Sequence, residues 1–197
     1  MSEPAPRGMN VDEFLRWEDG TDTRYELVCG EIRRREVASA IHSALLARLG
    51  ALIHDALKPQ PEQVALLSAA LVILGCADTC YLADIAVAPT PERWDDRLIR
   101  DPILIVEILS PSTTAFDRQT KVPDYRRIAS VREILLVDSE SVFAEILRRE
   151  GDHWITEIVQ GPTATLSLSS VPLTIPMAEL YDGIPMPEPR PSQAGIR

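Results

Sequence analysis

The chain has 197 residues, 45% of them hydrophobic but only 5% aromatic, so it is long enough for one domain with an aliphatic core. Its 30 acidic and 20 basic residues give a net charge of −10, which excludes a protein that coats nucleic acid or anionic membranes non-specifically. The charge does not exclude an enzyme that acts on nucleic acid at a local basic or metal-loaded site.

The two ends of the chain are predicted to be disordered tails on either side of a single domain. Residues 1–9 are polar and contain prolines, and residues 184–197 carry prolines at nearly every second position from 185 to 191. Neither composition supports a packed element. The domain is therefore expected to span residues 10–183.

The first half of the domain is predicted to contain two helices and several strands. Asn10 is a suitable cap for a short helix, and Cys29-Gly30 is a two-residue turn typical of a β-hairpin. Apolar residues at helical spacing predict a long helix, and three apolar runs after it are typical of strands. In chain order these elements are a helix over 11–17, hairpin strands over 25–28 and 31–35, a helix over 41–57, and strands over 64–67, 70–74 and 81–88.

The second half begins with residues 103–109, an almost unbroken run of Ile, Leu and Val that is typical of a strand buried on both faces. A helix is predicted next, ending near Ala129. Pro123 is tolerated in a first turn, so the regular part of this helix is expected to begin near Lys121. Strands follow over 133–138, 142–149, 153–159 and 165–168. The fold class is α/β (α+β), a mixed central sheet flanked by helices with a C-terminal antiparallel β meander.

The cysteines and the apolar segments indicate a cytoplasmic protein without a membrane partner. Cys29, Cys76 and Cys80 are too few for a disulfide framework. The N-terminus has no apolar signal segment, and the longest apolar run is too short to span a bilayer. Cys76 and Cys80 have the spacing of two zinc ligands, but no second pair accompanies them, so a zinc site is not favoured.

Two acidic residues interrupt apolar strands, Asp84 within residues 81–88 and Glu107 within residues 103–109. An unpaired buried charge is costly, so each carboxyl group must be protonated, paired with a cation or bound to a metal. For either acid alone, pairing with one of the 18 arginines is the commoner explanation. If the two converge from adjacent strands, they form an oxygen-rich site suited to Mg²⁺ or Mn²⁺.

Lys121 is one of only two lysines in the chain, the other being Lys58, which looks like a surface charge at a helix end. Lys121 follows Glu107 by 14 positions, after a strand that stops at Ser110-Pro111 and turns toward a helix. Functional groups gather at such strand ends in open sheets. A compact ammonium group there could contact a water molecule or a phosphate, and an ordinary solvated lysine is an equally good interpretation.

The ordered set of these motifs resembles the Uma family of endonucleases, members of the restriction-endonuclease-like PD-(D/E)XK superfamily. The resemblance covers roughly residues 10–182, and its most specific part is the glutamate-bearing strand that runs into Ser-Pro-Ser-Thr. The matching positions are Tyr25-Glu26-Leu27, Gly30-Glu31, His42, residues 83–87 and 105–113, Asp117, Lys121, Tyr125 and residues 136–138.

The resemblance implies a nuclease core in which Asp84 and Glu107 bind Mg²⁺ (or Mn²⁺). Superfamily members often carry a lysine two residues after the glutamate, but that position is Leu109 here, and the resemblance places the lysine at Lys121. Glu26 would be an accessory acidic residue near the metal. Two departures are Ala83, where the superfamily name expects Pro, and Cys29, where Asp is common.

The implied activity is metal-dependent hydrolysis of DNA phosphodiester bonds by an endonuclease, with weak, metal-dependent DNA binding and a homodimer that cuts both strands. His42 and Arg118 are candidate phosphate contacts, and a helix cap or surface role is the commoner interpretation of His42. The run Arg33-Arg34-Arg35 is either a phosphate contact or a solvated edge. Two alternatives stay open: a catalytically inactive nuclease-like fold that acts as a DNA-binding or protein-interaction module, and a metal-dependent hydrolase of smaller substrates.

Overall fold

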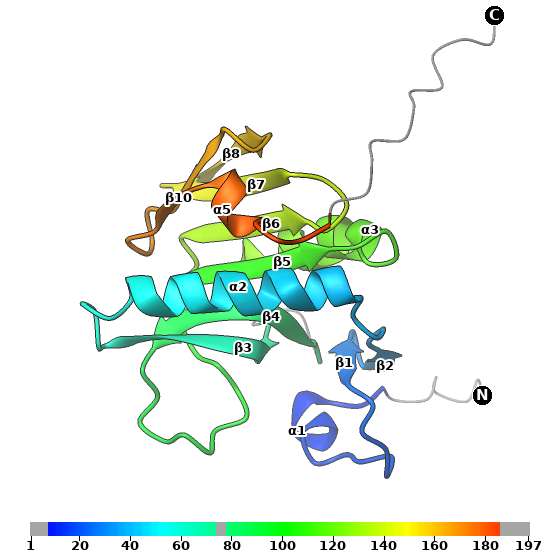
Figure 1. The fold of residues 1–197 in the computed structure, drawn as a ribbon. Coiled ribbons are helices and arrows are strands. Elements are labelled where there is room, and N and C mark those ends of the chain that lie inside the picture. Colours follow the sequence, from blue (N-terminus) through cyan, green and yellow to red (C-terminus); the bar gives the residue numbers. More distant parts are fainter. Residues whose placement is uncertain (1–7, 74–77, 186–197) are drawn as a thin grey trace, which may run out of the picture.

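A mixed β-sheet organises the computed structural model, which describes residues 8–73 and 78–185 (Figure 1). Its strands are β1 (Tyr25–Val28), β2 (Glu31–Arg34), β3 (Gln63–Val72), β4 (Cys80–Pro89), β5 (Leu104–Leu109), β6 (Glu133–Asp138), β7 (Phe143–Glu150) and β8 (His153–Gln160). Within the described ranges their order is β2-β1-β4-β5-β6-β7-β8, and β3 pairs with β4. The pair β5 and β6 is parallel and the other pairs of this sheet are antiparallel.

Helices cover both faces of the sheet, which confirms the predicted α+β class. The long helix α2 (Ala40–Ala56) lies across one face and α3 (Thr114–Phe116) lies behind the sheet in Figure 1. Each face has its own apolar core: Leu45 and Leu49 of α2 pack with Val106 of β5, whereas Tyr125 packs with Ile105 of the same strand. Among the described residues, no helix has the length and apolar character needed to cross a membrane.

The N-terminal elements follow the local sequence signals. Asn10 caps α1 (Val11–Phe14) in a reciprocal pair of hydrogen bonds with Glu13, although this helix ends three residues earlier than predicted. The hairpin β1–β2 turns at Cys29 and Gly30, whose φ angles of 51° and 83° are those of a two-residue hairpin turn. The Met9 N–H donates to the Gly30 carbonyl at 2.9 Å, so Met9 belongs to the domain rather than to the predicted tail.

Cys29 is a non-glycine residue in the left-handed region, where asparagine fits better because its short polar side chain hydrogen-bonds locally. Cys29→Asn should therefore raise the free energy of unfolding by about 1 kcal/mol. Urea denaturation measures it. Cys29→Ala is the matched control, because alanine has the same penalty at positive φ. An equal gain in both variants would show that the turn conformation is not the cause.

One strand replaces two predicted ones in the middle of the chain. The run 64–67 and residues 70–72 of the second run belong to a single strand, β3, because Ser68 adopts φ 52° without changing the register with β4; Leu74 lies outside the described residues. Leu67 pairs with Ile85 and Ala69 pairs with Ala83, while Ser68 itself lies opposite Asp84. A polar interruption in the sequence therefore marks a local backbone kink, not a strand end.

The helical segment after β5 differs most from its prediction. It begins at α3 directly after the turn at Ser110, continues through a π-helical turn, η1 (Asp117–Lys121), and ends with α4 (Val122–Tyr125). Lys121 is the last residue of the π turn, and the regular helix α4 begins beside it as predicted, but α4 ends at Tyr125 and the prediction that it runs to Ala129 is wrong. Pro123, which lacks an N–H group, lies in the first turn of α4 as predicted, and that turn follows a widened π turn.

The C-terminal region forms the predicted antiparallel meander from β6 through β8. The strand predicted over 165–168 is outside it: β9 (Thr165–Ser167) pairs with β10 (Thr174–Pro176) in a separate two-stranded sheet. That second strand and α5 (Met177–Leu180) were not predicted, since three or four residues give no readable period. Ile184 packs against the core and so adjoins the domain, whereas residues 1–7 and 186–197 of the predicted tails lie outside the described residues.

Glu133 fastens the loop after β9 to the start of β6. Its buried carboxylate accepts hydrogen bonds from the backbone and hydroxyl groups of Ser169 and Ser170, and Arg148 contacts it at 2.8 Å. Burial opposes the charge, but the hydrogen bonds from Ser170 and Ser169 hold the pKa of Glu133 below its ordinary value. Because the folded pKa is lowered, this stabilisation is present above the pKa of the unfolded chain and is lost as the pH falls through the folded pKa.

Glu133→Gln should lower the free energy of unfolding at pH 7 by about 3 kcal/mol, because the amide cannot accept the same charge-assisted hydrogen bonds. Urea denaturation at pH 7 and pH 4 should show a smaller difference at the lower pH. Glu157→Gln is the matched control, since Glu157 contacts the same Arg148 from a half-exposed position. Equal losses in the two variants would contradict this role for Glu133.

Candidate active site

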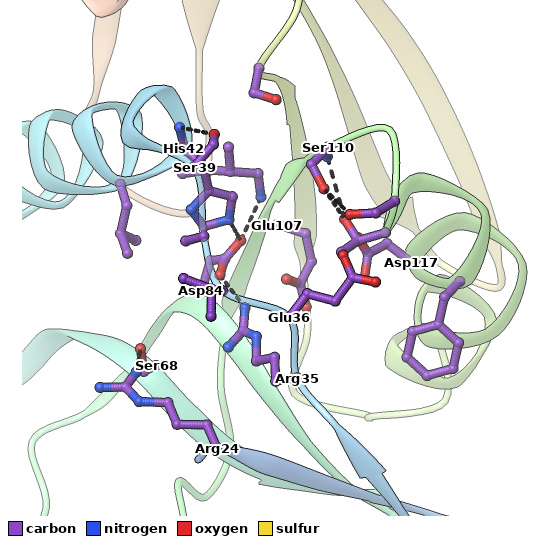
Figure 2. A pocket seen from close by; sticks show the side chains of 18 of the residues that line it. Arg24, Arg35, Glu36, Ser39, His42, Ser68, Asp84, Glu107, Ser110 and Asp117 are labelled. Carbon is purple, nitrogen blue, oxygen red and sulfur yellow. Dashed lines mark hydrogen bonds and ion pairs between the residues drawn. The ribbon is translucent and has the colours of Figure 1, made fainter. Parts of the chain in front are cut away.

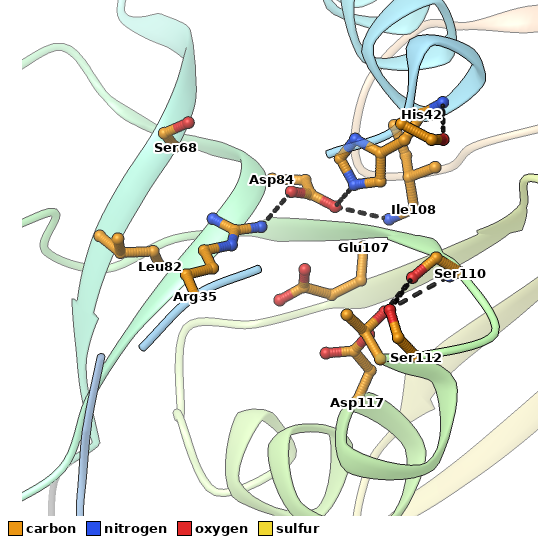
Figure 3. Close-up of polar contacts among 12 residues, drawn as sticks. Arg35, His42, Ser68, Leu82, Asp84, Glu107, Ile108, Ser110, Ser112 and Asp117 are labelled. Atoms are coloured by element: carbon orange, nitrogen blue, oxygen red, sulfur yellow. Dashed lines mark hydrogen bonds and ion pairs between the residues drawn. The ribbon is translucent and has the colours of Figure 1, made fainter. Parts of the chain in front are cut away.

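The sheet opens where the two predicted acids meet. Strand β4 pairs with β5 as far as Ile85 and Val106, and the next position in this register sets Asp84 opposite Glu107. The ladder stops there, and Asp84 Oδ2 instead accepts a hydrogen bond from the Ile108 N–H at 2.8 Å (Figure 3). Two neighbouring strands therefore part at a pair of carboxyl groups, each at most 3% exposed.

Glu26 fills the gap that the parted strands leave beside β4. Among the residues that the structure describes, strand β1 joins β4 through a single pair, Leu27 and Cys80, and the backbone of Leu82 has no strand partner on this side. Glu26 Oε1 accepts the Leu82 N–H at 2.9 Å. A carboxylate thus takes the place of a backbone carbonyl, which explains why a buried acid is tolerated in the short strand β1.

Lys121 joins the acids from the helical segment. Its Nζ lies 2.8 Å from Glu26 Oε1, 3.2 Å from Glu107 Oε1, 3.5 Å from Asp117 Oδ1 and 3.5 Å from the Leu82 carbonyl. Burial disfavours the ammonium form, but the charges of Glu107, Glu26 and Asp117 outweigh it and raise the pKa of Lys121. Lys121 is therefore a permanent cation, suited to balancing charge and not to accepting a proton.

Glu107 is held by two donors on one oxygen. Lys121 Nζ and the Tyr125 hydroxyl, at 2.6 Å, both donate to Oε1. Burial raises the pKa of Glu107 to about 8; Lys121 opposes this shift, and the charges of Asp84 and Asp117 add to it. Among the described residues both hydrogen bonds of Glu107 end on Oε1, which leaves Oε2 for a further partner.

Asp84 keeps its charge although it is just as buried. Burial would raise its pKa, but the hydrogen bond from His42 and the charges of Arg35 and His42 hold the pKa below the usual value. His42 Nε2 lies 3.1 Å from Oδ2, and Arg35 Nη2 contacts Oδ1. The pKa values of the two acids are therefore shifted in opposite directions, that of Asp84 below and that of Glu107 above its ordinary value.

These groups lie in a solvent-open cleft of about 890 Å³ (Figure 2). Its walls are the N-terminal end of α2, the residues around β2, and the turn between β5 and α3. The turn presents three hydroxyl groups linked by hydrogen bonds, while guanidinium groups approach from the hairpin. The polar lining includes Glu26, Asp84, Glu107, Asp117, Lys121, Ser110, Ser112, Thr113, Arg24, Arg33, Arg34 and Arg35.

The donor set fits a hard divalent cation. Within residues 8–73 and 78–185, no three His, Cys, Asp or Glu side chains form a ready metal cluster. Mg²⁺, however, takes only one or two carboxylates and keeps several water molecules. Of the oxygens of Asp84 and Glu107, Asp84 Oδ1 contacts only Arg35 and Glu107 Oε2 accepts no hydrogen bond within the described ranges.

The predicted site residues divide into two groups. Asp84, Glu107, Lys121 and Glu26 come together as described, and all four line the cleft. His42 is buried with 9% exposure and contacts Asp84, so neither a cap nor a surface role applies; Ser39 caps α2 instead. Arg118 pairs with Glu145 at 2.6 Å and does not appear among the described residues that line the cleft, so the structure gives no support for a phosphate contact there.

Three residues of the site were not given these roles by the sequence. Asp117 precedes Lys121 by four positions, a spacing that places ion partners together on a helix, and this signal was readable. Tyr125, whose hydroxyl donates a hydrogen bond to Glu107, lies one turn further along the same helical segment. Arg35 gave no separate signal within its run of arginines.

Of the cysteines, Cys76 lies outside the described residues, and burial raises the pKa of the Cys80 thiol to about 12.

The mixed sheet with paired acids at its opening is a nuclease-like fold. A crystal structure described as "a putative nuclease belonging to DUF820", from Anabaena variabilis, matches it with a TM-score of 0.71 at 21% identity, over 88% of this chain and 97% of that chain. The chain belongs to the Uma2 family, described as "Putative restriction endonuclease", whose match spans residues 11–178. The family and fold predicted from the sequence are thereby confirmed.

Two uncharacterized proteins of Synechocystis sp. are similar to the chain over most of its length. One is 29% identical over 186 residues, which are 93% of this chain and 96% of the relative. The other is 28% identical over 164 residues, which are 82% of this chain and 93% of the relative.

Proposed function

We propose that the protein is a Mg²⁺-dependent endonuclease that hydrolyses phosphodiester bonds of DNA. The observation that carries the proposal is the meeting of Asp84 and Glu107 where β4 and β5 part, inside an open cleft and beside a permanent ammonium group. Membership of a family of putative restriction endonucleases, and the likeness to the Anabaena protein described as a putative nuclease, support the same class of chemistry.

In this mechanism Asp84 and Glu107 would hold the metal. When bound, the metal supplies a Lewis acid for a phosphate oxygen and lowers the pKa of a bound water. His42 and the Ile108 N–H orient Asp84, and Tyr125 orients Glu107. Lys121 remains charged and offsets negative charge that develops near Glu107 during attack on the phosphate.

The test is cleavage of supercoiled plasmid by the purified protein with Mg²⁺ or Mn²⁺, with a single-stranded RNA of similar charge as a second arm. The proposal predicts nicked and then linear plasmid in the presence of metal and none with chelator. Cleavage of RNA alone would reassign the substrate. Retention of plasmid on the protein without cleavage, in either metal, would favour a catalytically inactive DNA-binding module.

Cutting both strands is easily served by two copies of one site, so we also propose a homodimer. Sedimentation of the protein alone and with plasmid-length duplex tests it. A monomer under both conditions, together with linear plasmid as the first product, would contradict the dimer.

A further inference from the structure

Arg35 lies where the hairpin meets the cleft. It directly follows β2, and its backbone N–H donates to the Arg24 carbonyl at 2.9 Å, which fixes its main chain. Its side chain reaches from there toward Asp84, and Figures 2 and 3 show the guanidinium group facing Asp84 and Glu107. Arg35 therefore brings a positive charge to the point at which the two acids meet.

The two cations of the site differ in their freedom to move. Lys121 contacts Glu26, Glu107 and Asp117, and its side chain is 3% exposed, so its departure would leave three buried acids without their shared cation. The Arg35 side chain is 19% exposed and lines the cleft. Of these two cations, Arg35 is the one that can move aside into the cleft.

The contacts of Asp84 are divided between its two oxygens. Oδ2 receives the Ile108 N–H and contacts His42 Nε2, both of which belong to the scaffold. Oδ1 receives Arg35 Nη2, its one contact within the described ranges. A cation that binds Asp84 through the cleft-facing oxygen therefore needs the same atom as the guanidinium group.

We infer that Arg35 and a divalent cation compete for Asp84 Oδ1, and that the displaced guanidinium group then binds the phosphate of the DNA at the metal. The inference rests on the proposed function, since it takes the metal at Asp84 and Glu107 as given. Because the Arg35 main chain is held by the hairpin, its released side chain stays in the cleft. Guanidinium groups bind phosphate oxygens through charge-assisted, often bidentate hydrogen bonds.

Calorimetric titration of Mn²⁺ into DNA-free protein tests the competition in the wild type, Arg35→Gln and Arg93→Gln. The last variant is the matched control, because it removes the same charge from an exposed arginine outside the described cleft lining. We expect Arg35→Gln to bind Mn²⁺ about tenfold more tightly than the wild type, and Arg93→Gln to stay within about twofold. At saturating metal, Arg35→Gln should need about tenfold more plasmid for half-maximal cleavage.

Tighter metal binding with weaker DNA binding is a combination that a purely structural role would not produce. Equal or weaker Mn²⁺ binding by Arg35→Gln would overturn the inference and leave the proposed function intact. Absence of Mn²⁺ binding in both the wild type and Arg35→Gln would overturn the metal-dependent function itself.

A second measurement uses the wild-type protein alone, so it does not depend on whether a variant folds. In ¹⁵N-labelled wild-type protein, the Arg35 Nε–H resonance should shift along the same Mg²⁺ titration curve as the Ile108 amide. An Arg35 resonance that stays unchanged while the Ile108 amide titrates would overturn the inference.

Discussion

Glu107→Gln is expected to reduce metal-dependent cleavage by about a thousandfold or more and to leave the protein folded. Glutamine keeps an oxygen to accept the Tyr125 hydroxyl and the Lys121 ammonium group, but it brings no negative charge to the metal. Plasmid cleavage at saturating Mg²⁺ measures the first effect. Glu145→Gln is the control, because Glu145 pairs with Arg118 outside the cleft lining. Comparable cleavage by the two variants would contradict the role of Glu107.

The same variant should change how stability depends on pH. Burial raises the folded pKa of Glu107 from its ordinary value of 4.5 to about 8, so the folded state binds this proton more tightly than the unfolded chain. The stability that goes with this proton is fully present below the unfolded pKa and is lost as the pH rises through about 8. Urea denaturation should therefore favour Glu107→Gln over the wild type increasingly from pH 5 to pH 9. A difference that does not change with pH would contradict the raised pKa.

Lys121→Met is expected to lower the free energy of unfolding by about 3–5 kcal/mol, because it removes the counter-ion of three buried acids, Glu26, Glu107 and Asp117. The chain supplies its own control in Lys58, whose ion pair with Asp55 has both side chains about two thirds exposed. Lys58→Met should cost less than about 0.5 kcal/mol. Urea denaturation of both variants at pH 7 measures the contrast, and similar losses would show that Lys121 does not hold the acids together.

Local sequence patterns predicted the helix and the strands that surround this site. The apolar period of residues 41–57 and the turn pair Cys29-Gly30 were sufficient for α2 and the hairpin, since both depend on neighbours in sequence. Asp84 and Glu107 were found because a carboxyl group inside an apolar strand needs an explanation wherever it lies. Their position on adjacent strands was an expectation that the β4–β5 register bears out.

The rest of the site depends on contacts that a local pattern does not contain. Lys121 lies inside a π turn, and nothing in the sequence around Pro123 distinguishes that turn from the start of a helix. Arg35 lies 49 positions from Asp84, and its two arginine neighbours carry the same local signal. In the folded protein Arg33 lies over the Phe116 ring whereas Arg35 reaches Asp84, a difference that no local pattern contains.

The most direct measurement is the anomalous scattering of crystals grown with Mn²⁺. We expect one strong peak beside Asp84 and Glu107, with the Arg35 guanidinium group moved from Asp84 into the cleft. A peak at other residues would contradict the proposed metal site. So would the absence of a peak at saturating Mn²⁺ in crystals in which Arg35 is still paired with Asp84.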